Sequence, residues 1–75
     1  MPKLPRPSGG DLVSFLLSRG FKLARIRGSH YMIEKGNLQT TVPVHGSEAV
    51  KIGTLRAILR DVEMSPADFA TLWNR

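Results

Sequence analysis

The sequence predicts one small α+β domain in which a helix is followed by three antiparallel strands and then by two more helices. Apolar residues repeat at helical spacing near both ends of the chain, whereas apolar and polar residues alternate over 21–44, and two glycine-containing dipeptides interrupt that alternation. A chain of 75 residues is long enough for one hydrophobic core and too short for two. We therefore expect a single domain over 1–75.

The N-terminal part of the chain predicts an extended arm followed by a helix. Residues 1–7 contain three prolines and two basic residues, which is typical of a flexible arm. Ser8 is a suitable N-cap, and Asp11 follows at the spacing of a capping box. The helix is expected to end at Arg19, because Gly20 suits the left-handed conformation that follows many helices. Its expected buried stripe consists of Val13, Leu16, Leu17 and Gly20.

Two tight turns divide the middle of the chain into three expected strands: 21–27, 31–35 and 38–44. Gly28-Ser29 and Gly36-Asn37 are both typical two-residue hairpin loops, and glycine at the first central position suits a type II′ turn. Loops of this length fix the register of the strands. The expected pairs are Arg27 with His30, Ile26 with Tyr31, Arg25 with Met32, Lys35 with Leu38, and Ile33 with Thr40.

This register gives the expected sheet one apolar face and one polar, open face. The apolar face, expected beneath the helices, carries Ala24, Ile26, Tyr31, Ile33, Thr40, Val42 and Val44. The open face carries Arg25, Arg27, His30, Met32, Glu34, Gln39 and Thr41. His30 is thus expected beside Arg27 and near Arg25. Pro43 has no N–H to donate, which indicates that the third strand is an edge strand.

The last third of the chain predicts two helices. The first begins near Gly53-Thr54 and buries Leu55, Ile58, Leu59 and Val62, with Arg56 and Arg60 on its opposite side. The second begins at Ser65-Pro66-Ala67-Asp68, which supplies an N-cap, a proline at the first helical position and an acid two residues later. This short helix is expected to end at Trp73.

Composition narrows the class of partner and the chemistry. The formal net charge of +5 favours nucleic acid, although an acidic protein would satisfy the same charge. The chain has no cysteine and only two histidines, without a carboxylate cluster, so we expect no disulfide, metal or other cofactor. No apolar run approaches the ~20 residues of a membrane span, and no signal peptide is evident. We expect a soluble cytoplasmic protein that does not bind a membrane.

His30 is the candidate catalytic residue. Histidine as a residue type titrates near neutral pH, and it can remove the proton of a ribose 2′-OH that then attacks the adjacent phosphorus. Arg25 and Arg27 are candidates to stabilise the charge that develops on the phosphorane. Ser29 is a candidate donor to a phosphate oxygen, although a role in the turn is the favoured alternative, and Gly28 is explained by the turn. An exposed histidine without a function is the alternative, and the pattern alone leaves both interpretations open.

Other polar residues are weaker candidates. His45 has the outward parity of the third strand and is a candidate acid or phosphate ligand; a role in capping the loop is the alternative. Lys51, Arg56 and Arg60 suit contacts with the backbone of a nucleic acid. Solvated surface charge is the alternative for each of them, and the two arginines suit a protein partner equally well.

Five motifs in order resemble the HicA family of toxins, the mRNA interferases of HicA–HicB toxin–antitoxin systems. They are Ser8-Gly9-Gly10-Asp11, Gly20-Phe21, Gly28-Ser29-His30, Thr41-Val42-Pro43-Val44-His45, and Gly53-Thr54-Leu55-Arg56 followed by Ile58-Leu59. The resemblance covers about 8–69. It implies a fold like that of a double-stranded RNA-binding domain and a metal-independent endoribonuclease that cleaves mRNA and arrests translation.

The resemblance also assigns roles. It implies that His30 is catalytic and that a HicB-type antitoxin binds the toxin and covers this residue. Many members of the family carry a second histidine directly after the first, where this chain has Tyr31, so a role for that position is in doubt. A non-catalytic RNA-binding module and a protein-interaction module are the alternatives, because a fold alone does not define an activity.

Overall fold

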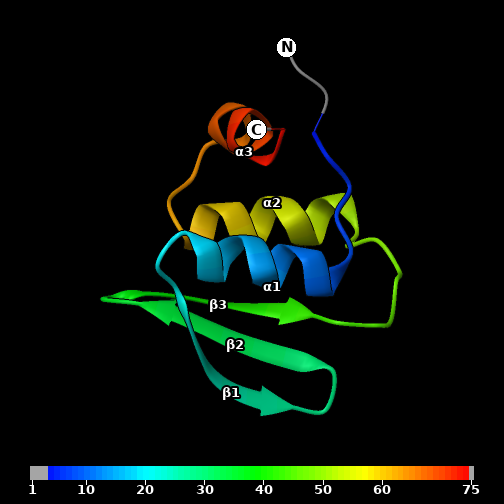
Figure 1. Cartoon of the computed structure of the whole chain (residues 1–75), viewed down its shortest axis with the longest axis vertical. Helices are drawn as coiled ribbons and strands as arrows, with labels where there is room; N and C mark the ends of the chain where they lie inside the picture. Colours follow the sequence, from blue (N-terminus) through cyan, green and yellow to red (C-terminus); the bar gives the residue numbers. More distant parts are fainter. Residues whose placement is uncertain (1–3, 75) are drawn as a thin grey trace.

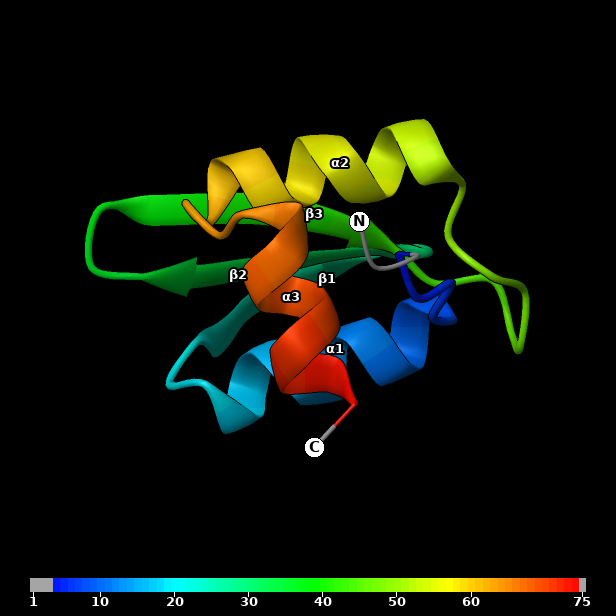
Figure 2. The same ribbon diagram turned by 90° about the horizontal axis from the view of Figure 1, so that it is seen from above.

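The structure is a computed structural model that describes residues 4–74. In chain order its elements are α1 (Gly9–Ser18), β1 (Lys22–Arg27), β2 (His30–Lys35), β3 (Leu38–Pro43), α2 (Ile52–Asp61) and α3 (Pro66–Trp73). The strands form one antiparallel sheet in the order β1-β2-β3. Helices α1 and α2 lie side by side on one face of the sheet, and α3 crosses them on the side away from it (Figures 1 and 2). This is the predicted arrangement, an α-β-β-β-α fold like a double-stranded RNA-binding domain with an added helix.

The ends of the helices follow the predicted capping residues. The Ser8 hydroxyl accepts a hydrogen bond from the Asp11 backbone N–H at 3.1 Å, and Ser65 accepts one from the Asp68 N–H at 3.0 Å. After α1, Gly20 adopts φ +96°, the left-handed region that was expected there. Each helix boundary that the sequence predicted lies within one residue of its expected position.

The register of the sheet is the predicted one at both turns. The five expected pairs are all present: Arg27–His30, Ile26–Tyr31, Arg25–Met32, Lys35–Leu38 and Ile33–Thr40. Because β2 lies between the other two strands, β3 is an edge strand, as Pro43 indicated.

β1 contains a β-bulge that straight alternation did not predict. Leu23 pairs with Ile33 and Arg25 pairs with Met32, so Ala24 is an extra residue without a partner of its own. Leu23 therefore occupies the helix side of the sheet, where Ala24 was expected. Ala24 itself is exposed, and its prediction as a residue of the apolar face was wrong.

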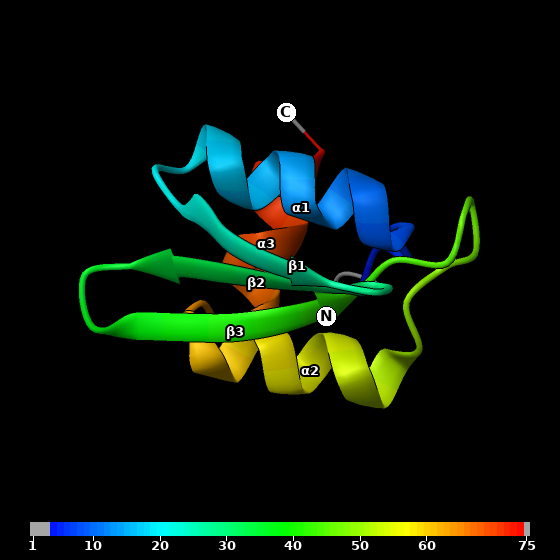
Figure 3. The ribbon, with the colours of Figure 1, turned by 90° about the horizontal axis from the view of Figure 1, so that it is seen from below.

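Leu17 and Ile26 were predicted to be buried, but their side chains are 41% and 51% exposed. Ile26 belongs to β1 and Leu17 to α1, which lies on the β1 side of the sheet, whereas α2 packs against β3 at the opposite side (Figure 3). The helix layer therefore covers the β1 side incompletely. In α1 the buried stripe is Gly9, Leu12, Val13 and Leu16. Gly20, also expected in that stripe, is exposed because it lies beyond the end of the helix.

For residues 4–7 the structure differs from the expected flexible arm. Leu4 packs against the core and Pro7 is buried. The Pro7 carbonyl accepts a hydrogen bond of 2.8 Å from the Val50 N–H, and Ser8 forms an isolated antiparallel bridge with Ala49. These residues are held because the pairing satisfies backbone groups next to the core. The rest of the expected arm, 1–3, lies outside the described residues.

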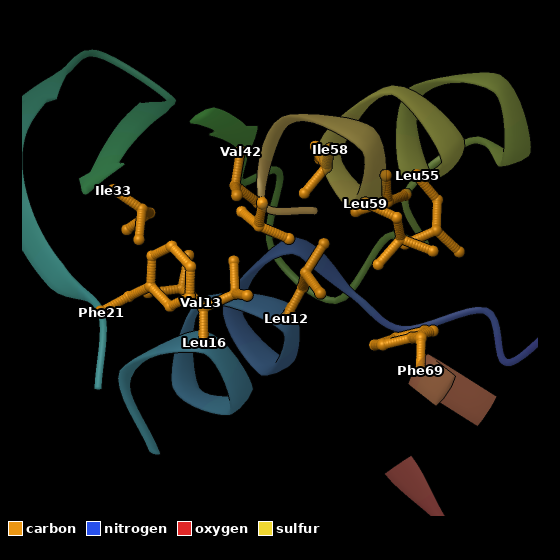
Figure 4. Packing of buried hydrophobic residues seen from close by; sticks show 12 residues of the cluster. Leu12, Val13, Leu16, Phe21, Ile33, Val42, Leu55, Ile58, Leu59 and Phe69 are labelled. Atoms are coloured by element: carbon orange, nitrogen blue, oxygen red, sulfur yellow. The ribbon is translucent and has the colours of Figure 1, made fainter. Parts of the chain in front are cut away.

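The core fills the space between the sheet and the three helices (Figure 4). Its fully buried side chains include Leu12, Leu16, Ile33, Val42, Leu55, Ile58, Leu59 and Phe69. At its rim, the hydroxyl of the buried Thr40 donates a hydrogen bond of 3.0 Å to the Asp61 carboxylate. This bond joins β3 to the last residue of α2. Within the described residues, no helix has the length and apolarity to cross a membrane.

The N-terminus of α1 touches the end of β3 at Gly9. A Cβ atom built on Gly9 overlaps the carbonyl oxygen of Pro43 and lies 2.8 Å from the Cα of Val44. Gly10, the next residue, has nothing within 4 Å of the same hypothetical atom. The close approach therefore requires glycine at position 9 and tolerates a side chain at position 10.

We expect Gly9→Ala to destabilise the fold by about 2 kcal/mol or more, since the atoms that must move belong to the backbone of β3. Gly10→Ala is the matched control and is expected to be neutral or stabilising by up to ~1 kcal/mol, because alanine is the better helix former. Urea unfolding followed by circular dichroism measures both changes. Equal midpoints for the two variants would contradict the close contact.

Candidate active site

The turn between β1 and β2 sets the position of His30. Gly28 has φ +60°, and Ser29 does not have a positive φ, which agrees with the predicted type II′ turn. The Val44 N–H donates a hydrogen bond of 2.7 Å to the Ser29 carbonyl. The turn is thus attached to the chain that leaves β3, and His30 begins β2 immediately after it.

His30 and Arg27 are direct cross-strand partners, and Pro43 of β3 lies on the other side of His30. Residues opposite one another on neighbouring strands have Cβ atoms about 4.5–5.5 Å apart, so the long Arg27 side chain is within reach of the imidazole. The next row contains Arg25, Met32 and Thr41. The predicted cluster of one histidine and two arginines is therefore formed.

The cluster lies on the face of the sheet that the helices leave open (Figure 3). His30, Arg25 and Arg27 are all exposed. Within residues 4–74 none of their side chains takes part in a side-chain hydrogen bond. Their donor groups are consequently available to a ligand in the isolated chain.

Lys22 belongs to the same face and was missed by the sequence analysis. Straight alternation places it beneath the helices, but the bulge in β1 reverses the parity, and Lys22 pairs with Glu34 on the face of His30. A signal was present in the sequence. Leu23 and Ile26 are three residues apart, so both face the helices only if the strand contains an extra residue.

The open face is predominantly cationic. Lys22, Arg25 and Arg27 follow one another along β1, and Glu34 is the one acidic residue among β1, β2 and β3. A row of cations beside an exposed histidine attracts an anionic ligand. Among the described residues there is no group of three or more His, Cys, Asp and Glu side chains arranged to hold a metal ion.

His45 and Lys51 lie beyond the end of β3, outside the strands of the sheet. They line a hollow of ≈ 180 Å³ together with Pro43, Glu48, Ala49, Val50 and Thr54. Pro43 borders both this hollow and His30, so the hollow adjoins the His30 row. The carbonyl of His45, rather than its ring, closes the loop by accepting a hydrogen bond of 3.0 Å from the Glu48 N–H.

The remaining candidates lie away from His30. Arg56 and Arg60 are exposed on α2, where they border a second hollow with Leu59, Met64 and Pro66. Tyr31 pairs with Ile26 and Val42 on the helix side of the sheet and packs against the core. Tyr31 therefore does not share the face of His30.

Fold and site together define a class: a small double-stranded RNA-binding-domain-like protein with a single histidine among arginines on its open sheet face. A family model described as "HicA toxin of bacterial toxin-antitoxin" matches residues 9–64. This chain belongs to the HicA toxin family and is the toxin component of a toxin–antitoxin system. The predicted resemblance is confirmed. A search of curated proteins found no match.

We expect Gly28→Ala to destabilise the fold by roughly 1–2 kcal/mol, because φ +60° is unfavourable for any residue with a Cβ. Nothing lies within 4 Å of the added atom, so steric overlap does not contribute. Gly53→Ala, in α2 and equally unhindered, is the control and is expected not to destabilise. Thermal unfolding would compare the two, and a fully stable Gly28→Ala would mean that this turn does not fix His30.

Proposed function

We propose that this chain is an endoribonuclease that cleaves mRNA without a metal ion, with His30 as its catalytic residue. The cross-strand pairing of His30 with Arg27 carries the proposal, since it brings a proton acceptor and a fixed cation together on an open, basic face. Membership of the HicA toxin family supports the same activity. The protein would act in the cytoplasm, where mRNA is translated.

The proposed reaction uses the substrate's own 2′-OH as the nucleophile. His30 accepts the 2′-OH proton while the 2′ oxygen forms a bond to the adjacent phosphorus. Arg27 and Arg25 stabilise the charge on the phosphorane oxygens, and Ser29 and Lys51 contribute further phosphate contacts. The bond from phosphorus to the 5′ oxygen then breaks, and a proton donated to that oxygen completes the reaction. The products carry a 2′,3′-cyclic phosphate and a 5′-OH.

We propose two possible roles for His45: it donates the proton to the leaving 5′ oxygen, or it binds a phosphate. Its hollow adjoins the His30 row through Pro43, and Lys51 lines the same hollow. A lysine or a water molecule would serve the same purpose. Loss of His45 should therefore reduce the rate less than loss of His30.

We further propose that a HicB-type antitoxin neutralises the toxin by covering His30. Membership of a toxin–antitoxin family supports an antitoxin partner that restrains the toxin. The site lies on an exposed sheet face, and a bound protein would exclude RNA from it without entering a deep pocket.

In a labelled-RNA assay containing EDTA, we expect His30→Ala to lower the cleavage rate 10²–10⁴-fold, the usual contribution of proton transfer. His45→Ala is the matched histidine control and is expected to lose less than 10-fold. End-group analysis should find 2′,3′-cyclic phosphates, and circular dichroism should find both variants folded. Equal cleavage by the parent and His30→Ala would remove His30 from the mechanism.

A non-catalytic RNA-binding module is the second candidate function. The basic row along β1 and the fold favour it, because both suit RNA binding without any chemistry. Intact RNA in the presence of the parent protein, together with measurable binding, would favour this alternative.

RNA binding itself is tested with a His30→Ala background, in which the RNA stays whole. We expect the double change Arg25→Gln and Arg27→Gln to weaken binding and to reduce the slope of log affinity against log salt by ~0.7 for each phosphate that the protein no longer neutralises. The control pair, Arg56→Gln with Arg60→Gln on α2, should bind within about twofold of its parent. If RNA binding weakens equally in both double variants, RNA does not bind specifically at the β1 arginines.

A further inference from the structure

The surface around β1 combines three exposed apolar residues with a row of cations. Leu17, Leu23 and Ile26 are 41%, 40% and 51% exposed. In the described part of the chain the only other exposed large apolar residue is Ile52, at the start of α2. The apolar exposure is therefore concentrated at one side of the molecule.

The apolar residues lie on the helix side of β1. Leu23 and Ile26 pair with Ile33 and Tyr31, which face the helices. In α1, Phe15 points toward α3, where its ring centroid is 5.2 Å from that of Phe69. Leu17, two residues later, is rotated about 200° from Phe15 and thus points away from α3. Figure 3 shows that α1 lies on the β1 side of the sheet, so the three apolar residues belong to two neighbouring elements.

The other side of the same strand is cationic. Lys22, Arg25 and Arg27 project from the open face, because the bulge at Ala24 brings all three to one side. The outer edge of β1 has no neighbouring strand among the described residues, so its backbone N–H and C=O groups are free to pair. We call this combination of Leu17, Leu23, Ile26, Lys22, Arg25 and Arg27 the β1 edge surface.

We propose that the β1 edge surface binds an extended segment of the antitoxin whose side chains alternate between acidic and apolar residues. Such a segment adds a strand to β1. Its acidic side chains lie opposite the cations of the open face, and its apolar side chains pack against the exposed Leu17, Leu23 and Ile26, since successive residues of a strand point to opposite faces. The proposal rests on the proposed function in taking an antitoxin as the partner.

Charge complementarity selects this partner. A second copy of the chain, paired through the same edge, would place arginines opposite arginines, and like charges in that position are destabilising. RNA would satisfy the cations and leave the three apolar residues in water. The bulge and the cations of β1 also disfavour pairing with most other strands, so this edge favours a segment that carries acidic residues. Bound there, the segment is separated from His30 by β1 alone, since His30 is the cross-strand partner of Arg27.

The test uses this chain and the product of a neighbouring open reading frame with HicB-like sequence, which is the antitoxin that the proposed function expects. Ile26→Lys and Leu17→Lys are each expected to weaken antitoxin binding at least 10-fold in titration calorimetry. Ile52→Lys, the same change at an exposed apolar residue elsewhere (40% exposed), should bind within twofold of the parent. Without antitoxin, Ile26→Lys should cleave RNA like the parent, because this side chain lies on the helix side of the sheet. Circular dichroism verifies that each variant is folded.

Hydrogen exchange gives a second readout that needs no variant. Antitoxin binding should slow exchange of amides in residues 22–27 at least 10-fold. Parent-like binding by Ile26→Lys and Leu17→Lys, equal weakening by Ile52→Lys, or protection confined to α2 and α3 would overturn the proposal. Protection of residues 22–27 by RNA but not by antitoxin would also overturn it and assign the surface to RNA.

The outcome is separable from that of the proposed enzyme. Antitoxin binding at β1 by a chain that leaves RNA intact would reject the nuclease and support this interface. If the chain cleaves RNA but its antitoxin binds elsewhere, the proposed nuclease activity stands and the proposed interface at the β1 edge surface is rejected. If the neighbouring protein fails to bind the parent chain, the interface is rejected whatever the result of the RNA assay.

Discussion

The two-residue turn at Gly28 and Ser29 fixes the pairing of β1 with β2, and the placement of the side chains on the sheet follows from that pairing. A loop of two residues permits one register, in which Arg27 faces His30. Ile33 then points into the core, and His30 points to the open face. The same hairpin thus contributes a buried side chain to the fold and an exposed one to the candidate site.

Two features of the strands determine how this sheet meets the helices and the solvent. At the end of β3, glycine at position 9 lets the N-terminus of α1 touch the backbone of Pro43 and Val44, next to the His30 row. In β1, the bulge at Ala24 places Lys22 on the same face as Arg25 and Arg27, and it places Leu23 on the same face as Ile26. The first feature closes the core, whereas the second leaves a surface that the chain itself does not cover.

The division of the molecule into a closed and an open side explains how so small a domain carries a site. The helices bury the apolar face, with Phe69 completely enclosed, and the opposite face is largely polar and charged. A nuclease of the proposed kind needs only a histidine and cations held at fixed spacing, which a sheet provides without a deep pocket. The proposed antitoxin segment would occupy the edge of this sheet, so that catalysis and neutralisation would depend on the same few rows of residues.

The sequence by itself determined the order of the elements, the helix caps at Ser8 and Ser65, both turns and the pairing of Arg27 with His30. These features are local: each depends on residues within a few positions of one another, and hairpin loops convert them into register. Tertiary structure decided the rest. Whether Leu17 and Ile26 are covered depends on where α2 lies, and the attachment of Pro7 to Val50 joins residues far apart in the chain. The bulge that adds Lys22 to the face of His30 was indicated only by the three-residue spacing of Leu23 and Ile26. A strand contains such an extra residue when the core packing before and after it requires one.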